Sequence, residues 1–349
     1  MQAAPKLRAF AQHVLKQPAL KQGQHVDPLD PGEAREDRSA WGPARRDAFA
    51  SREMERFREA LRIDDRDVRA GVLDDLSTFF DLPPEECLRR CLHWEDISVA
   101  EWQAGDRSSP EGLLDFYRSL TSWSFDLAWY CYLQTEGYAI PTSVMVARFL
   151  RTTGRTGGRH LDFGSGAGAT SQLFGRLGYE TALADISKPL LDFARFRLDR
   201  RGDAASYLDL VSAELETEHY DVITALDTLV HVPDLGETAR DLHRALRSGG
   251  WLFANFDVRP PSDENAWHLY DDDLVLRWTV QHAGFEQRAV LDGFTHCYQK
   301  VDPTGWRHQA RGARDTLVLR NPVRRHARRV RWPTRAGLTR RFRRVAGRG

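Results

Sequence analysis

The sequence predicts an α/β fold with a mainly parallel sheet, preceded by an extension built of helices. From about residue 158, short apolar segments alternate with segments of helical length, which is typical of parallel strands joined by helices on both faces of a sheet. From about 51 to 138, apolar residues recur at helical spacing and no strand pattern interrupts them. The two patterns together predict the α/β class and the helical extension.

The predicted strands are short and apolar, and most are separated by segments of helical length. They are RHLDFG (159–164), ETALAD (180–185), ASYLDL (205–210), YDVITAL (220–226) and WLFANFD (251–257). Helices are expected after Gly168, Ser187 and Asp234, because an amphipathic pattern follows each of these residues. A further helix within 271–285 precedes two late strands within 286–300.

The helical extension carries helix-start signals and many aromatic residues. Prolines at 83–84 predict a helix start, and SVAE (98–101) and SSPE (108–111) both have the form of a capping box. The segment 112–138 is rich in Phe, Tyr and Trp. These aromatic side chains fit either the wall of a substrate pocket or an ordinary helical core.

Length, cysteine content and hydropathy bound the class of protein. A chain of 349 residues predicts one large core with appendages, or two domains. Four cysteines are too few for a disulfide framework, and Cys87 and Cys91 fit one buried stripe of a helix better than a metal site. No apolar run approaches 18 residues and no signal-peptide pattern is present, so we expect a cytoplasmic protein without a membrane span.

The net charge of zero conceals an asymmetric distribution of charge. The segment 307–349 contains fifteen arginines and one acidic residue, whereas the rest of the chain is strongly acidic. Such a tail can bind a nucleic acid or another acidic partner. Alternatively, it is a disordered segment whose arginines reflect base composition, because no lysine occurs after Lys300.

A glycine-rich turn, GSGAG, follows the first predicted strand and opens a helix. Glycine has no Cβ, so its backbone can approach a ligand closely. The turn fits two patterns. One is the dinucleotide fingerprint G-x-G-x-x-A, from Gly164 to Ala169, with Asp185 about 20 residues further on. The other is D-x-G-x-G-x-G, from Asp162 to Gly168.

Four motifs in order resemble those of the class I S-adenosylmethionine (SAM)-dependent methyltransferases, across roughly residues 111–300. LDFGSGAG (161–168) is similar to the first motif of that family, and ALADIS (182–187) to the second. YDVITALDTLVHVPD (220–234) is similar to the fourth-strand motif of small-molecule members. LHRALRSGGWLFAN (242–255) resembles the helix, Gly-Gly turn and fifth strand that follow. An NAD domain is not expected to carry the last two motifs, so an NAD(P) oxidoreductase is disfavoured.

The resemblance implies a fold, a cofactor and an organisation of the chain. The fold is a Rossmann-like class I methyltransferase sheet, mostly parallel with an antiparallel last strand, and the cofactor is SAM. We expect a partly disordered segment over 1–50 and a helical cap for substrate recognition over 51–138. The SAM-binding domain is expected over 139–302 and the Arg-rich tail over 303–349.

The resemblance also assigns cofactor contacts to residues of this chain. Asp185 is expected to accept hydrogen bonds from both ribose hydroxyls, and Ile186 to pack on adenine. Asp162 supplies negative charge near the ammonium and sulfonium groups, and Asp209 is the candidate for a polar contact to adenine. The expected cofactor-binding residues are Asp162, Gly164, Ser165, Gly166, Gly168, Asp185, Ile186, Asp209, Ala225, Leu226 and Asp227.

Three histidines are candidates for a general base. His268 follows the fifth strand, in a connection that borders the acceptor pocket in the family, and is the preferred base. His231, in DTLVHVPD, is the second candidate, although family members also carry histidine there without using it as a base. His296 lies in a predicted strand and is expected to be structural. Asp227, Asn255 and Asp257 offer oxygen atoms to Mg²⁺, but their spacing does not require a metal, and none is predicted.

The expected function is transfer of a methyl group to a small-molecule acceptor, at oxygen. The place where many nitrogen methyltransferases carry an Asn/Asp-Pro-Pro-aromatic run reads ALDTLV here. A methyltransferase of RNA or protein that uses the basic tail is the first alternative. A catalytically silent SAM-binding protein is the second, since cofactor binding does not by itself imply turnover. The oligomeric state is left open.

Overall fold

The computed structural model describes residues 25–30, 38–105, 110–258 and 268–320. Much of the segment predicted to be partly disordered, and most of the Arg-rich tail, lie outside the described residues. The serine of the predicted SSPE capping box lies outside them as well.

The chain divides into two compact units. The first comprises Met1–Glu214 with Arg259–Asp271, and the second comprises Leu215–Val258 with Asp272–Gly349. The predicted boundary between the cap and the sheet domain, at residue 138, falls within the first unit and stays a prediction.

Seven strands form a mixed sheet with the order β3-β2-β1-β4-β5-β7-β6. Their bounds are β1 Gly158–Phe163, β2 Tyr179–Asp185, β3 Ser206–Asp209, β4 Tyr220–Ala225, β5 Leu246–Asn255, β6 Phe285–Leu291 and β7 Thr295–Lys300. In the first unit, β1, β2 and β3 are parallel. In the second, β4 and β5 are parallel and β7 runs antiparallel to both β5 and β6. The predicted sheet, mostly parallel with an antiparallel last strand, is confirmed.

The helices between the strands begin where the sequence predicts. They are α10 Ala169–Arg176, α11 Lys188–Arg200, α12 Leu235–Ala245 and α13 Asp273–His282. A last helix, α14 Trp306–Arg320, follows β7 and occupies the start of the Arg-rich tail, where no helix was predicted. Side-chain caps explain two of the starts: Ser187 accepts a hydrogen bond from the backbone N–H of Leu190, and Asp234 from that of Glu237. The strand β2 is buried over almost its whole length, as expected for a central parallel strand covered on both faces.

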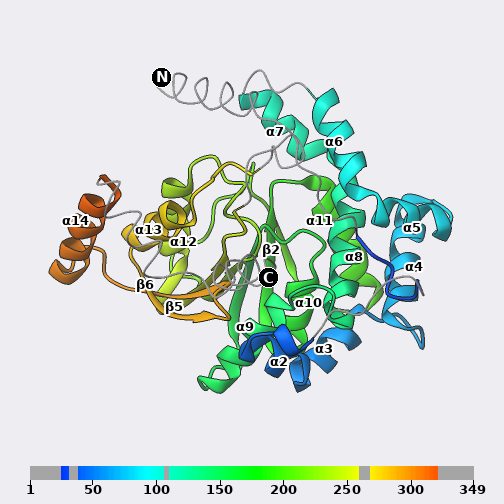
Figure 1. Cartoon of the computed structure of the whole chain (residues 1–349), viewed down its shortest axis with the longest axis horizontal. Coiled ribbons are helices and arrows are strands. Elements are labelled where there is room, and N and C mark those ends of the chain that lie inside the picture. Colours follow the sequence, from blue (N-terminus) through cyan, green and yellow to red (C-terminus); the bar gives the residue numbers. More distant parts are fainter. Residues whose placement is uncertain (1–24, 31–37, 106–109, 259–267, 321–349) are drawn as a thin grey trace, which may run out of the picture. The chain divides into compact units, whose positions relative to one another are not determined.

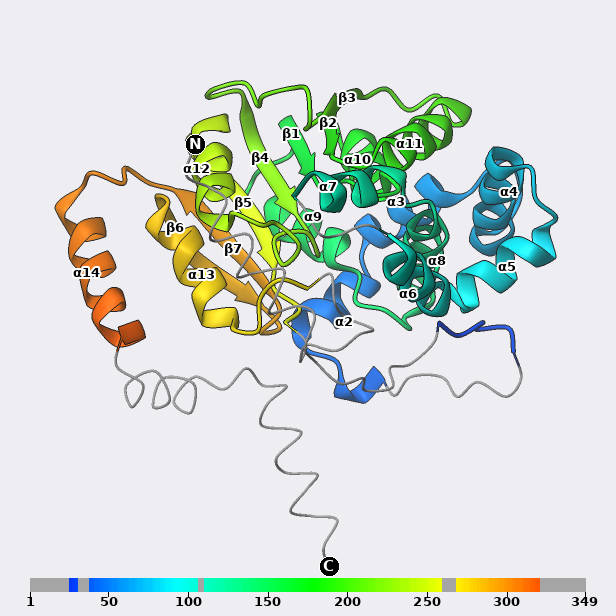
Figure 2. The same ribbon diagram turned by 90° about the horizontal axis from the view of Figure 1, so that it is seen from above.

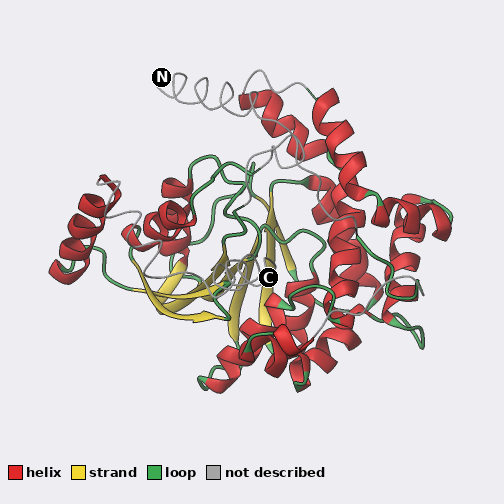
Figure 3. Ribbon diagram, viewed as in Figure 1, coloured by secondary structure: helices red, strands yellow, loops and turns green. Residues whose placement is uncertain are grey.

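The helical extension lies in the first unit and consists of one short 3₁₀ helix and eight α-helices among the described residues. Their bounds are η1 Arg38–Ala40, α2 Pro43–Phe49, α3 Arg52–Leu61, α4 Val68–Phe80, α5 Pro84–Leu92, α6 Trp94–Ala104, α7 Pro110–Ser119, α8 Ser122–Glu136 and α9 Thr142–Thr152. The helix α8 packs against α3, α4, α5 and α6, and also against α11 (Figures 1 and 2). Figure 3 shows the helices in red and the strands of the sheet in yellow. The predicted helical extension is confirmed.

One predicted helix start is wrong. The SVAE segment was expected to cap a helix at Ser98, but α6 already begins at Trp94, so Ser98 lies inside the helix. Its hydroxyl is 2.9 Å from that of Ser122, and both side chains are buried. The capping-box pattern is misleading here because the serine pairs with a residue of another helix. The start predicted from the two prolines is confirmed, since α5 begins at Pro84.

The two cysteines of the predicted helical stripe behave as expected. Cys87 and Cys91 lie on α5, and both are fully buried. Burial raises the pKa of the Cys87 thiol to about 11, so it is protonated at neutral pH. Among the described residues, no group of three or more His, Cys, Asp or Glu side chains could hold a metal ion.

Candidate functional site

The glycine turn lies in the first unit, between β1 and α10. Gly164, Gly166 and Gly168 have φ angles of 71°, 51° and 77°, a region that other residues rarely adopt. A Cβ atom at Gly166 would also lie 2.7 Å from Cδ1 of Leu127, on α8. The backbone conformation therefore favours glycine at 166, and a side chain there would also displace the end of the Leu127 side chain.

Asp185, at the carboxyl end of β2, holds the turn through its side chain. One carboxylate oxygen accepts the backbone N–H of Gly166 at 3.0 Å, and the other accepts that of Ser187 at 2.9 Å. The residue is only 7% exposed, and burial raises its pKa against the opposing effect of these hydrogen bonds. The backbone N–H of Ile186 also contributes a hydrogen bond, which leaves the carboxylate about one lone pair for a further donor. This arrangement fits a ribose hydroxyl.

Asp162 lies inside β1, two residues before the turn. Its side chain is 3% exposed, and it accepts a hydrogen bond from the hydroxyl of Ser171 on α10 at 3.4 Å. A carboxylate buried at the start of a ligand turn is costly unless a cation or a hydrogen-bond donor offsets its charge. An ammonium or sulfonium group bound at the turn would supply such a cation.

Ile186 and Asp209, the residues expected at adenine, both contact the helical extension. Ile186 packs against a cluster formed by Trp102, Phe116, Tyr117 and Leu120, which we call the aromatic cluster. Asp209, at the end of β3, pairs with Arg118 of α7 at 3.3 Å and is the register partner of Asp185. The aromatic cluster belongs to the core of α6 and α7. Its contact with Ile186 was not predicted from the sequence. The aromatic-rich segment 112–138 was the one sequence feature that could have indicated it.

A buried ionic cluster connects α4 to the same turn. Asp75 of α4 is fully buried and forms ion pairs with Arg197, Arg200 and Arg201 of α11. Arg197 is itself 1% exposed, and its guanidinium donates a hydrogen bond to the carbonyl oxygen of Ala167, within the turn. The sequence contains no local sign of this cluster, because Asp75 lies more than a hundred residues before the arginines that it pairs with.

The second unit contains the remaining residues expected at the cofactor. Ala225 ends β4 and is fully buried, and Leu226 and Asp227 follow it half-buried. Asp227 has a φ of 54° and is held by Asn255 of β5. The Asn255 side-chain oxygen accepts the Asp227 backbone N–H at 2.8 Å, and its NH₂ group donates to the Asp227 carboxylate. Two of the oxygen groups considered for Mg²⁺ thus bind each other.

The three candidate histidines lie in different settings. His231 belongs to the second unit, in the turn after β4, and its backbone N–H bonds to the carbonyl of Thr228 at 2.9 Å. His268 belongs to the first unit and is half-buried. His296 is 5% exposed and hydrogen-bonded to Gln287, and burial lowers its pKa to about 3. It is neutral at physiological pH, and it lies in β7, in a strand as predicted.

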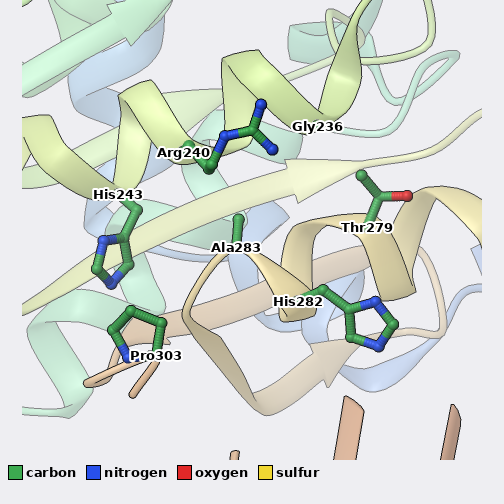
Figure 4. A pocket seen from close by; sticks show the side chains of 7 residues that line it. All are labelled: Gly236, Arg240, His243, Thr279, His282, Ala283 and Pro303. Carbon is green, nitrogen blue, oxygen red and sulfur yellow. The ribbon is translucent and has the colours of Figure 1, made fainter. Parts of the chain in front are cut away.

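A pocket of about 400 Å³ lies within the second unit (Figure 4). Its lining comes from α12, α13 and the start of the segment that leads to α14: Gly236, Arg240, His243, Thr279, His282, Ala283 and Pro303. His243 there is bonded to the carbonyl oxygen of Val301 at 2.9 Å, and burial lowers its pKa. None of the predicted cofactor or catalytic residues lines this pocket, so it is separate from the candidate site.

The comparison with protein families agrees with the fold and the turn. Residues 143–345 match the methyltransferase-domain family, which covers more than half of the chain. The chain therefore belongs to this family of class I SAM-dependent methyltransferases. The match confirms the predicted family and, with it, SAM as the cofactor.

The curated relatives match part of the chain. A ubiquinone biosynthesis O-methyltransferase of Nitrosomonas europaea is 29% identical over 157 residues, which cover 44% of this chain and 61% of the relative. One from Thiobacillus denitrificans is 33% identical over 101 residues, which cover 28% of this chain and 43% of the relative. The chain thus spans roughly half the length of these relatives.

Solved structures with methyltransferase folds are also similar. Phosphoethanolamine N-methyltransferase 2 of Haemonchus contortus, in complex with SAM, has a TM-score of 0.40 at 19% identity, over 50% of this chain and 45% of that chain. A SAM-dependent methyltransferase of Mesorhizobium loti has a TM-score of 0.36 at 16% identity, over 44% of this chain and 96% of that chain. These scores are too low to add to the family match. Among the described residues, no helix has the length and apolar character needed to cross a membrane.

Proposed function

We propose that the protein is a SAM-dependent methyltransferase that methylates an oxygen atom of a small molecule. The observation that carries the proposal is the pair formed by the glycine turn and the buried Asp185 carboxylate, in a chain of the methyltransferase family. The curated relatives are named O-methyltransferases of ubiquinone biosynthesis, which supports oxygen as the methylated atom and a small molecule as the acceptor.

We propose that the cofactor residues act as the sequence predicts. Asp185 holds the ribose hydroxyls, Ile186 packs on adenine, and Asp209 makes the polar contact to adenine. Asp162 faces the cationic groups of the methionine part. The backbone of the turn approaches the cofactor closely at Gly164, Ser165, Gly166 and Gly168. The cofactor contacts expected of Ala225, Leu226 and Asp227 stay predictions from the sequence.

The chemistry divides between the cofactor and the protein. When bound, SAM supplies a methyl group on a positively charged sulfur that leaves as a neutral thioether. The protein holds the acceptor oxygen in line and removes its proton where needed. Ionising a phenol of pKa about 10 at pH 7 costs ~4 kcal/mol, and an aliphatic hydroxyl costs far more. The acceptor therefore decides how strong a base is required.

The predicted bases, His268 and His231, remain predictions. His268 lies in the first unit with the glycine turn, and His231 lies in the turn that follows β4. An acidic partner for the Arg-rich tail, a nucleic acid among them, is also a prediction from charge alone, because residues 321–349 lie outside the described ranges. The same holds for a cytoplasmic location.

An activity assay tests the proposal, with the same aspartate-to-alanine change made at the site and at a control position. Purified protein is incubated with methyl-labelled SAM and a panel of phenols and alcohols, and the methylated products are measured by mass spectrometry. Asp185→Ala should abolish transfer and S-adenosylhomocysteine (SAH) binding. The control Asp192→Ala removes an exposed carboxylate that pairs with Lys188 on α11, and it should leave both unchanged. Transfer by Asp185→Ala at the wild-type rate would contradict the proposal.

A further inference from the structure

The carbonyl group of Ala167, in the middle of the glycine turn, has its hydrogen-bond partner outside the turn. Ala167 is only 4% exposed, and Nη1 of Arg197, on α11, donates a hydrogen bond to its carbonyl oxygen. Among the described residues, no other donor reaches this oxygen. A buried carbonyl without a partner is unfavourable, so the orientation of this peptide group depends on Arg197.

The residues on either side of Ala167 give this part of the turn little stiffness of its own. Gly166 and Gly168 have φ angles of 51° and 77°, which glycine adopts without strain. Glycine also populates many other angles, and it loses more conformational freedom on ordering than any other residue. The N–H of Gly168 is held inside the turn by the carbonyl of Ser165 at 2.9 Å. The carbonyl side of the same peptide group is held by Arg197.

Arg197 is held in turn by the helical extension. Its side chain is 1% exposed, and its Nε lies 3.2 Å from Oδ2 of Asp75, on α4. The Asp75 carboxylate is fully buried and also pairs with Arg200 and Arg201. The extension therefore reaches the carbonyl of the cofactor turn through two side chains, both inside the first unit.

Stability alone does not account for a buried arginine at this position. Nη2 of Arg197 is buried and has no hydrogen-bond partner among the described residues. A buried donor left unpaired is unfavourable, and apolar residues of similar volume often replace a buried ion pair without loss of stability. An apolar side chain at 197 would, however, leave the Ala167 carbonyl without its donor. The turn therefore explains the arginine better than stability does.

We propose that Arg197 is a positioning residue of the cofactor site and that Asp75 of the helical extension holds it in place. The inference rests on the proposed function, in which the backbone of the glycine turn approaches SAM closely. Arg197 keeps the Ala167 peptide group in one orientation, so the turn is ordered before the cofactor binds. Without it the turn samples other orientations, and the affinity falls by the fraction of time spent in the competent one. Neither side chain has to touch the cofactor.

The test compares Arg197→Met with a matched control, Arg176→Met. Arg176, on α10, also joins a carboxylate and a carbonyl, those of Asp203 at 3.0 Å and Glu59 at 2.8 Å, and neither partner belongs to the turn. Methionine retains much of the side-chain volume and removes the charge and the donors. The Kd for SAH is measured by calorimetry on the full chain, at a temperature where circular dichroism shows each variant folded.

The two variants should differ in cofactor affinity. We expect Arg197→Met to raise the Kd for SAH about 10- to 100-fold, which corresponds to a turn that is competent about 10% to 1% of the time. Arg176→Met should lower the melting temperature and leave the Kd within about twofold of the wild type. If Arg197→Met does not fold, Arg197→Lys takes its place. Lysine keeps the charge but lacks the planar fork that joins Asp75 to the carbonyl, so the Kd should rise about 3- to 30-fold.

Two further measurements separate positioning from folding. In the protein without SAH, amide hydrogen exchange over residues 164–168 should be faster in Arg197→Met and unchanged in Arg176→Met. In the methyl-transfer assay, Arg197→Met should raise the KM for SAM and leave kcat within about threefold, because a residue that only orders the turn does not act on the reacting atoms. A general loss of stability would not produce this division between KM and kcat.

Several results would overturn the inference. They are a Kd within twofold of the wild type in the folded Arg197 variant, equal rises in Kd in the Arg197 and Arg176 variants, or unchanged exchange in the turn. A fall in kcat with no change in KM would also overturn it. A wild type that binds SAH but methylates no oxygen acceptor would contradict the proposed function and leave this inference standing. A wild type that does not bind SAH would overturn both.

Discussion

The glycine turn and the helical extension of the first unit are held together by different kinds of contact. In the turn, the important contacts are made by backbone groups and by residues within about 20 positions of each other, such as Gly166 and Asp185. In the extension, they are side-chain pairs between distant residues: Asp75 with Arg197, and His25 with Asp126. The contacts that shape the cofactor turn are therefore local in the sequence, whereas those that couple the extension to the turn join distant residues.

The largest expected effect concerns the buried ionic cluster. Asp75→Asn removes the carboxylate that Arg197, Arg200 and Arg201 share and leaves buried cationic groups without a counter-charge. We expect a loss of about 3–5 kcal/mol in the free energy of unfolding, measured by urea titration. Asp74→Asn is the control, because its pairs with Arg66 and Arg200 are partly exposed, and it should cost less than about 1 kcal/mol. Equal losses in the two variants would show that the cluster does not hold the extension.

The second prediction concerns the approach of α8 to the turn. Gly166→Ala places a methyl group 2.7 Å from Leu127 in a backbone conformation with φ of 51°. We expect the Kd for SAH to rise about 10- to 100-fold in calorimetry, from overpacking and backbone strain. Gly175→Ala, inside α10 with its nearest atom at 3.9 Å, is the control and should not weaken binding. Adding Leu127→Ala should recover part of the loss, and an unaffected Kd in Gly166→Ala would contradict the geometry.

The third prediction concerns acid stability of the sheet region. His160 of β1 is fully buried against Phe174, and burial lowers its pKa to about 3. In the unfolded chain its pKa is about 6.5, so the unfolded state binds the proton first as pH falls. Its contribution to stability is complete above about pH 6.5 and is lost progressively toward pH 3, by about 2 kcal/mol at pH 5. His160→Phe should remove this part of the pH dependence, measured by urea titration at pH 7 and pH 5. If His160→Phe loses as much free energy of unfolding between pH 7 and pH 5 as the wild type does, His160 is hydrated or paired in a way that keeps its ordinary pKa.

The smallest expected effects concern the pair between α7 and β3. Arg118 and Asp209 are each about 30% exposed, so Arg118→Gln should cost less than about 1 kcal/mol of stability and leave SAH affinity within twofold. Asp209→Ala should raise the Kd for SAH about fivefold if its carboxylate contacts adenine, the value of one hydrogen bond. Equal affinity in both variants would remove Asp209 from the cofactor site and leave it a partner of Arg118 alone.

The same contrast explains how much could be predicted from the sequence. The strands, the helices between them and the glycine turn follow from patterns of a few neighbouring residues, and all are confirmed. The contacts of the extension could not be predicted, because a helical pattern shows which face is apolar but not which distant side chain it meets. Ser98 illustrates this: its local pattern indicates a cap, whereas the fold pairs it with Ser122. The His25–Asp126 pair was missed for the same reason, since the two residues are 101 positions apart.

Calorimetric titration of the purified protein with SAH, with NADH and NADPH in parallel, shows whether the glycine turn with Asp185 binds SAM. We expect micromolar binding of SAH, one site per chain, and no heat from either dinucleotide. Binding of a dinucleotide with no binding of SAH would contradict this expectation.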